Sequence, residues 1–190
     1  MGLHLSTSFR ILGSMNGEPD GLDRLWAPWR MTYIRAPSSS RCFLCEAFAD
    51  GADAREWLRV ASDVHGGVVL NRYPYNNGHV LVAPRRHVPD FAALSEADRL
   101  ALINWVTEAV EVLRTELRPD GFNIGVNLGR VAGAGLEAHL HVHVVPRWNG
   151  DVNFMPVIAH TKVIPQALEE LWEQLDRAFR QRVRSGEPRS

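Results

Sequence analysis

The seven residues 139–145, His-Leu-His-Val-His-Val-Val, place an imidazole at every second position and an aliphatic side chain between each pair. Because side chains of a β-strand alternate between its two faces, this spacing predicts a strand that carries His139, His141 and His143 on one face and buries the aliphatic residues in the core. Imidazole has an ordinary pKa close to neutrality, so such a face can supply a nucleophile, a proton carrier and a metal ligand.

Two less specific explanations apply to the same segment. Histidines can fall in a strand by chance, and an alternating His-x-His pair also occurs in three-histidine zinc sites. The chain has eight histidines, and three of them at strict two-residue spacing, each separated by an aliphatic residue, favour a shared chemical role.

The pattern of 139–145 resembles the signature of the histidine triad (HIT) superfamily. Residues 70–87, LNRYPYNNGHVLVAPRRH, resemble the nucleotide pocket of that family, and residues 127–148, NLGRVAGAGLEAHLHVHVVPRW, resemble its phosphate loop and catalytic strand. Two further runs, RLWAPWRMTYI near the start and PRWNGDVNFMPVI after the triad, are most similar to the bacterial diadenosine tetraphosphate (Ap4A) phosphorylase branch.

The resemblance implies an enzyme that cleaves a dinucleoside polyphosphate at its α-phosphate. His141 matches the nucleophile that forms a nucleotidyl-histidine intermediate. His143 matches the residue that polarises the leaving group, and His79 matches a pocket histidine with an orienting role. The branch favours inorganic phosphate as the acceptor, whereas water would make the chain an Ap4A or phosphoramidate hydrolase. Candidate contacts for phosphate are Arg147, Asn149 and Lys162.

The glycine-rich run before the triad is the second part of the expected nucleotide site. Gly133 and Gly135 lie where backbone amides can approach phosphate oxygens, although an ordinary hairpin loop has the same composition. The resemblance implies that Asn127 is the pocket amide and that Asn71 binds the ribose hydroxyls. Many family members have a hydroxyl or amide side chain where this chain has Gly135, so a backbone amide or water must replace that contact.

Cys42 and Cys45 are the only cysteines, and their C-x-x-C spacing is half of a tetrahedral zinc site. Two free thiols or a redox-active pair would have the same spacing. In zinc-bearing triad proteins, the other two ligands match His87 and His139 here. The resemblance therefore implies a structural zinc that fixes His139 and thereby aims His141. A non-catalytic, zinc-organised nucleotide-binding protein is the alternative to an enzyme.

Length and charge narrow the class of protein. A chain of 190 residues can form one domain of ordinary size with extensions. A net charge of −1 argues against a general nucleic-acid binder. The sequence has no apolar run of the roughly eighteen residues that a membrane helix needs and no convincing signal-peptide core. We therefore expect a cytoplasmic protein with neither nucleic acid nor membrane as a partner.

The periodicities predict an α+β chain with about five strands, a helix between the third and fourth of them, and a C-terminal helix. The resemblance implies that this is a HIT-like fold, with an antiparallel sheet and the first helix between the pocket strands and the glycine loop. The strands are expected at 57–61, 67–71, 79–84, 122–127 and 139–146. Ser95 and Asp98 form a capping-box pattern at the start of the first helix, which Pro119 ends. The second helix, at about 165–183, has one apolar stripe, which is typical of a packing or dimer surface.

We expect residues 1–22 to be a disordered extension, residues 23–163 to form the HIT domain, and residues 164–190 to form the C-terminal helix and tail. The resemblance also implies a homodimer. Three tryptophans flank the expected pocket and could stack on adenine, although core packing is the simpler role: Trp26, Trp29 and Trp148.

Overall fold

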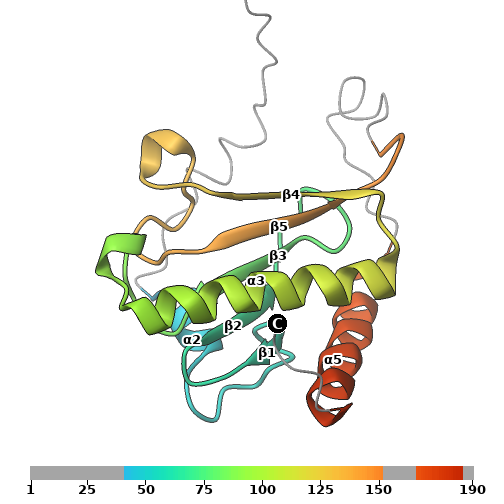
Figure 1. Ribbon diagram of the computed structural model, residues 1–190, viewed down its shortest axis with the longest axis horizontal. Coiled ribbons are helices and arrows are strands. Elements are labelled where there is room, and N and C mark those ends of the chain that lie inside the picture. Colours follow the sequence, from blue (N-terminus) through green and yellow to red (C-terminus); the bar gives the residue numbers. More distant parts are fainter. Residues whose placement is uncertain (1–40, 152–165, 186–190) are drawn as a thin grey trace, which may run out of the picture.

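The structure, a computed structural model, describes residues 41–151 and 166–185. Its centre is a five-stranded antiparallel sheet with the order β1-β2-β3-β5-β4 (Figure 1). The α+β prediction and the expected sheet are therefore confirmed. The strands are β1 (Arg59–Ser62), β2 (Gly66–Leu70), β3 (Val80–Pro84), β4 (Gly121–Val126) and β5 (Val142–Arg147).

The two faces of the sheet have different neighbours, as the alternating sequence predicts. Leu140, Val142 and Val144 belong to the main core, which the long helices cover. On the opposite face, Val69 and Ala83 pack in a smaller cluster with the short helix α2 (Phe43–Ala47). Since side chains alternate along β5, its histidines lie on the face away from the main core.

Strand β5 begins later than we predicted. It starts at Val142, and residues 139–141 lie before it. The physical reason is Pro84, which ends β3 and has no N–H to continue the ladder beyond the Val82 and Val142 pair. The Leu140 N–H instead donates to the carbonyl oxygen of Val88 at 2.6 Å.

Helix α3 (Glu96–Leu117) follows the expected boundaries. The Ser95 hydroxyl accepts a hydrogen bond from the Asp98 N–H at 3.1 Å, and Arg118 adopts a left-handed conformation directly before Pro119. The helix packs on the sheet with a broad buried face, which includes Leu102, Trp105, Ala109, Val112 and Leu113.

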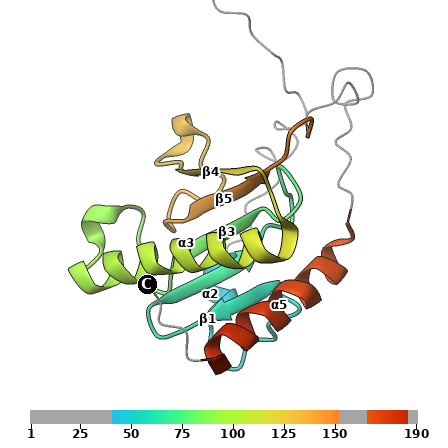
Figure 2. The same cartoon turned by 45° about the vertical axis from the view of Figure 1, so that its right-hand side comes forward.

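The C-terminal helix α5 (Leu168–Ser185) packs beside α3 and against β1 (Figure 2). Its apolar stripe contributes Leu171, Leu175 and Phe179 to the main core. The indole N–H of Trp172 donates to the carbonyl oxygen of Arg59 at 3.1 Å. The stripe is therefore a packing surface within the chain. The structure also contains α2 and two short 3₁₀ helices, Phe91–Ala93 and Arg130–Ala132, which we did not predict.

The expected N-terminal extension, Trp26, Trp29 and Lys162 lie outside the described residues. Among the helices that the structure describes, none has both the length and the apolarity of a membrane span.

Replacing Phe179 with alanine tests whether α5 is part of the domain core. The ring is 2% exposed, so its loss should lower the free energy of unfolding by about 3–5 kcal/mol. Arg177→Ala, at an exposed position of the same helix, should change it by less than about 0.5 kcal/mol. Urea denaturation measures both values, and equal effects of the two substitutions would contradict the packing of α5.

Asp98 joins the start of α3 to the neighbouring turns. Its carboxylate accepts hydrogen bonds from the Ser95 hydroxyl at 2.7 Å and from Arg86 at 3.3 Å, and it lies 3.2 Å from Nδ1 of His65. These contacts, that of Ser95 first, lower the pKa of Asp98 to about 2.

A carboxyl group with a pKa lower in the folded than in the unfolded state stabilises the fold above its unfolded pKa of ~3.9, and this stabilisation disappears as the pH falls through the folded value. The difference in free energy of unfolding between the wild type and Asp98→Asn should therefore be largest above about pH 4 and should shrink toward pH 2. Urea denaturation across this range measures it. If the difference in free energy of unfolding between the two proteins did not change with pH, the lowered pKa of Asp98 would be contradicted.

Candidate active site

His79, which is distant in the sequence from His141 and His143, lies in one group with them on the outer face of the sheet. The ring centroids of His141 and His143 are 5.0 Å apart, and those of His79 and His143 are 5.2 Å apart. His143 is a residue of β5, while His79 directly precedes β3, the neighbouring strand. The structure thus brings together the three residues that the sequence analysis named as catalytic.

The ring of His141 is held in one tautomer. Its Nδ1 lies 2.8 Å from the carbonyl oxygen of His139, which can only accept, so Nδ1 carries the proton and Nε2 keeps its lone pair. The residue is 6% exposed, and burial lowers the pKa of His141. A neutral imidazole with its lone pair on Nε2 has the electronic form of a nucleophile.

His79 and His143 form a hydrogen-bonded pair with a defined direction. The backbone N–H of Tyr75 donates to Nδ1 of His79 at 3.0 Å, so the neutral ring of His79 carries its proton on Nε2. Nε2 lies 3.0 Å from Nδ1 of His143 and donates to it. The neutral ring of His143 therefore carries its own proton on Nε2, where it can act as a hydrogen-bond donor.

The turn before His79 needs a glycine. Gly78 has a φ of +73°, and a Cβ atom at this position would lie 2.4 Å from Cδ1 of Leu117 and 3.1 Å from Cγ of Pro146. Any larger residue would push the turn away from α3 and β5. Gly78 thus allows the turn to bring His79 next to His143.

Tyr75 is a site residue that the sequence analysis missed. Its ring centroid lies 4.7 Å from that of His79 and 5.8 Å from that of His143, with 23° between the Tyr75 and His143 planes. The side chain covers the histidine pair and remains partly exposed. An aromatic residue within the pocket-like run 70–87 was the only available signal, and it did not indicate this contact.

The expected nucleotide-binding residues lie at both ends of the site. The amide nitrogen of Asn71 is 3.2 Å from Nδ1 of His79. The amide nitrogen of Asn127 donates to the carbonyl oxygen of Gly133 at 3.4 Å, and Gly133 has a φ of +88°. Gly135 is exposed in the same loop, between β4 and the triad.

The four expected metal ligands form one cluster. The ligand atoms of Cys42, Cys45, His87 and His139 all lie within 4.8 Å of one another. Nδ1 of His139 is 3.2 Å from Sγ of Cys42 and 3.5 Å from Sγ of Cys45, and Nδ1 of His87 is 3.1 Å from Sγ of Cys45. A tetrahedral zinc with sulfur and nitrogen ligands requires ligand separations of about 3.5 Å, so this cluster can hold such an ion.

The chemistry of the cluster also fits a metal. Nε2 of His139 donates to the carbonyl oxygen of Pro84 at 2.8 Å, which leaves the lone pair of Nδ1 for the ion. Burial, followed by the neighbouring Cys42, raises the pKa of Cys45 to about 11. A metal that binds the thiolate would therefore displace a proton.

His139 belongs both to the four-ligand cluster and to the alternating histidines of residues 139–143. The side chain of His139 belongs to the cluster, whereas its carbonyl oxygen accepts the hydrogen bond from Nδ1 of His141. Cys45 lies on α2 and His87 follows β3. The cluster thus connects α2 to the backbone that orients the central histidine.

Arg147, one of the candidate phosphate contacts, forms an ion pair within the protein. Nε and one terminal nitrogen of its guanidinium donate to the two oxygens of Asp151 at 2.7 and 2.8 Å, and the other terminal nitrogen donates to Asn123 at 2.7 Å. The ion pair raises the pKa of Arg147 and holds that of Asp151 far below its ordinary value. The positive charge is therefore already balanced inside the protein.

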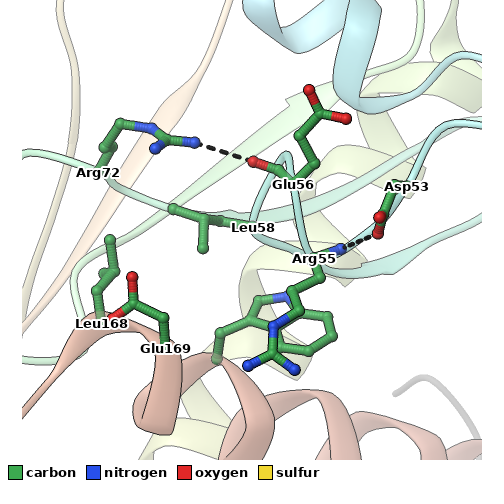
Figure 3. A pocket seen from close by; sticks show the side chains of 8 residues that line it. Asp53, Arg55, Glu56, Leu58, Arg72, Leu168 and Glu169 are labelled. Atoms are coloured by element: carbon green, nitrogen blue, oxygen red, sulfur yellow. Dashed lines mark hydrogen bonds between the residues drawn. The ribbon is translucent and has the colours of Figure 1, made fainter.

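A separate cavity of about 330 Å³ lies between β1 and α5 (Figure 3). It contains two arginines, three carboxylates and an indole, but no imidazole or thiol. Arg72 donates to the carbonyl oxygen of Glu56, and Arg55 lies over the ring of Trp172. Because its lining includes none of the triad or cluster residues, it is not the candidate site. The lining residues are Asp53, Arg55, Glu56, Leu58, Arg72, Leu168, Glu169 and Trp172.

Comparison with known proteins agrees with this geometry. The HIT domain model matches residues 59–150. An AP-4-A phosphorylase of Mycobacterium tuberculosis is 43% identical over 162 residues, which are 81% of this chain and 83% of that protein. An uncharacterized HIT-like protein of Methanocaldococcus jannaschii is 36% identical over 110 residues, covering 58% of this chain and 81% of its own length.

Two solved structures are similar in fold and sequence. A zinc-bound histidine triad family protein from Mycobacterium smegmatis has a TM-score of 0.59 and 27% identity, covering 77% of this chain and 97% of its own. A hypothetical histidine triad nucleotide-binding protein from Sulfolobus tokodaii has a TM-score of 0.60 and 25% identity, covering 76% and 96%. The chain therefore belongs to the histidine triad (HIT) family of proteins.

Proposed function

We propose that this HIT-family enzyme cleaves a dinucleoside polyphosphate such as Ap4A at its α-phosphate through a nucleotidyl intermediate on His141. The observation that carries the proposal is the hydrogen bond from Nδ1 of His141 to the His139 carbonyl oxygen, which directs the lone pair to Nε2. The similarity to the mycobacterial AP-4-A phosphorylase supports the substrate class.

In the first step, Nε2 of His141 attacks the α-phosphorus, and the bond from phosphorus to the bridging oxygen breaks. For Ap4A, this leaves an adenylyl group on His141 and releases ATP. The ring of His141 becomes positively charged in the intermediate, and its Nδ1–H, which donates to the His139 carbonyl, stabilises that charge. The Nε2–H of His143 donates a hydrogen bond to the departing oxygen, on which negative charge develops.

In the second step, an acceptor attacks the same phosphorus and restores the neutral ring of His141. With inorganic phosphate the product is ADP, and with water it is AMP. We propose phosphate as the acceptor on the basis of the AP-4-A phosphorylase relative. Because Arg147 is already paired with Asp151, we favour the backbone amides of the glycine loop and Lys162 as the groups that hold phosphate.

We propose that the substrate lies between the Asn71 end and the loop of residues 129–135. Asn71 would contact the ribose hydroxyls and Asn127 would act as the pocket amide. Asn127 already supports the loop through the Gly133 carbonyl. Backbone amides near Gly133 and Gly135 would contact phosphate oxygens, since no side chain obstructs a glycine.

We propose that Cys42, Cys45, His87 and His139 hold a structural zinc. All four positions are filled by protein ligands, so the ion would have no open coordination site, and its contribution would be to stability and orientation. Its four ligands would join α2, the segment after β3 and the residue whose carbonyl holds His141.

We also propose a homodimer. Strand β4 is an edge of the sheet, and Ile124 on it is 50% exposed. Leu100 and Ile103 of α3 are 64% and 56% exposed. Exposed apolar side chains on a sheet edge and on a neighbouring helix are typical of a surface that pairs with another chain.

Replacing His141 with alanine should lower the turnover of Ap4A by roughly 10³-fold or more, because no covalent intermediate can form. Nucleotide binding, measured by calorimetry, should persist. His65→Ala, a change at an exposed histidine, is the matched control and should retain activity. Unchanged turnover in the His141 variant would exclude this nucleophile.

The products identify the acceptor. The wild type incubated with Ap4A should release ATP and ADP, and only when inorganic phosphate is present. Chromatography of the adenine nucleotides measures this outcome. Formation of ATP and AMP regardless of phosphate would contradict the phosphorylase and establish water as the acceptor.

Substitution of His87 tests the zinc proposal. The wild type should contain one zinc per chain, and His87→Ala should lose most of it and unfold at a lower temperature, because a structural site needs its four ligands. Elemental analysis and thermal denaturation measure both properties, and for the zinc content His65→Ala is the control for removal of an imidazole. Full zinc content in His87→Ala would refute this ligand set.

A further inference from the structure

The turn that carries His79 is anchored to the end of β5 by a buried amide. Asn76 is 6% exposed, and its side-chain nitrogen donates to the carbonyl oxygen of Pro146 at 3.0 Å and to Asp151 at 2.7 Å. The two protons of the amide nitrogen thus have two acceptors, and neither acceptor belongs to the turn itself.

Asp151 is in turn held by other groups. Its carboxylate accepts two hydrogen bonds from Arg147 and one from the backbone N–H of Trp148 at 3.1 Å. These contacts lower the pKa of Asp151 far below its ordinary value, so the carboxylate is charged at neutral pH. Charge-assisted hydrogen bonds with two-point geometry position their acceptor strongly.

Asn76 lies between two backbone groups that contact His79. The preceding residue, Tyr75, donates its N–H to Nδ1 of the His79 ring at 3.0 Å. The carbonyl oxygen of Asn76 itself accepts the backbone N–H of His79 at 3.2 Å. The side chain of Asn76 therefore anchors the segment that carries the Tyr75 donor. A second donor to Nδ1 of His79, the amide nitrogen of Asn71 at 3.2 Å, does not belong to this turn.

We infer that Asn76, held by Asp151 and Arg147, is a positioning residue that sets the tautomers of His79 and His143. The anchored turn places the Tyr75 N–H on Nδ1 of His79, which keeps the proton of His79 on Nε2. That proton is donated to Nδ1 of His143, which keeps the proton of His143 on Nε2. The inference rests on the proposed function in assigning to His143 the donation to the leaving group.

The chain offers a matched control in the next residue. Asn77 is also an amide in the same turn, but its nitrogen donates to Gln166 at 3.3 Å rather than to the end of β5. If Asn76 only stabilised the turn, Asn76→Ala and Asn77→Ala would both leave the proton positions on the histidine rings unchanged.

The first experiment measures the tautomers without turnover. In protein labelled with ¹⁵N-histidine, two-bond nitrogen–proton correlations should show the wild-type rings of His79 and His143 protonated on Nε2. Asn76→Ala should shift one or both rings toward the Nδ1 tautomer, whereas Asn77→Ala should keep the wild-type pattern. Wild-type tautomers in Asn76→Ala would overturn the inference.

The second experiment uses leaving groups of different quality. Phenolate leaves from an AMP ester less readily than p-nitrophenolate, so it depends more on a hydrogen-bond donor. Loss of such a donor costs roughly 10²–10³-fold in kcat, and misplacement should cost part of this. Asn76→Ala should lower kcat for the phenyl ester at least about tenfold more than for the p-nitrophenyl ester. Equal losses with both esters would contradict the inference.

Asp151→Asn provides a second variant of nearly the same shape, in case Asn76→Ala does not fold. It retains an acceptor for Asn76 but removes the charge that pairs with Arg147, so it should shift the tautomers in the same direction, by less. Unchanged tautomers in this variant would then overturn the inference. A wild type that cleaves neither ester would count against the proposed function, while the NMR result would still decide the role of Asn76.

Discussion

The antiparallel pairing of β3 with β5 is the constraint on which both functional clusters depend. Its register, with Leu81 opposite His143 and Val82 opposite Val142, places the residue before β3 next to the middle of β5. The same pairing ends at Pro84, which cannot donate a ladder hydrogen bond, and the freed carbonyl oxygen of Pro84 accepts from His139. One strand pair thus positions His79 at one end and the metal cluster at the other.

A second consequence of this pairing is that the imidazoles of His139, His141 and His143 have different hydrogen-bond partners. The side chain of His139 belongs to the cysteine cluster, His141 is buried and donates through Nδ1, and His143 accepts from His79. The proton lies on Nε2 in His139 and His143 and on Nδ1 in His141, and in each ring the hydrogen-bond partner sets this position. Neutral imidazole offers one donor and one acceptor, and these partners decide which nitrogen is left for chemistry.

Much of the candidate site was predictable from the amino-acid sequence. The three imidazoles at alternate positions and the C-x-x-C spacing indicated five of the residues that the structure brings together. His79 and His87 were expected only from the resemblance to the HIT family. The prediction of the strand start at residue 139 was wrong, because Pro84 belongs to the partner strand and its effect requires knowledge of the register. The structure pairs Arg147, a candidate phosphate contact, with Asp151 four residues further along the chain. We did not predict this ion pair, and the phosphate role of Arg147 stays a prediction.

The sequence by itself determined the alternation that separates imidazoles from core, the start of α3 at Ser95, the apolar stripe of α5 and the family. These are local patterns, whose physics depends on residues a few positions apart. Only the tertiary structure decided the tautomers of the histidines, the closure of the four-ligand cluster, the burial of Asn76 and the neutralisation of Arg147. Each of these depends on which atoms meet within hydrogen-bonding distance in the folded chain. Some come from distant segments, as in the four-ligand cluster, and some from nearby residues, as in the pair of Arg147 and Asp151, and the order of residues does not specify either.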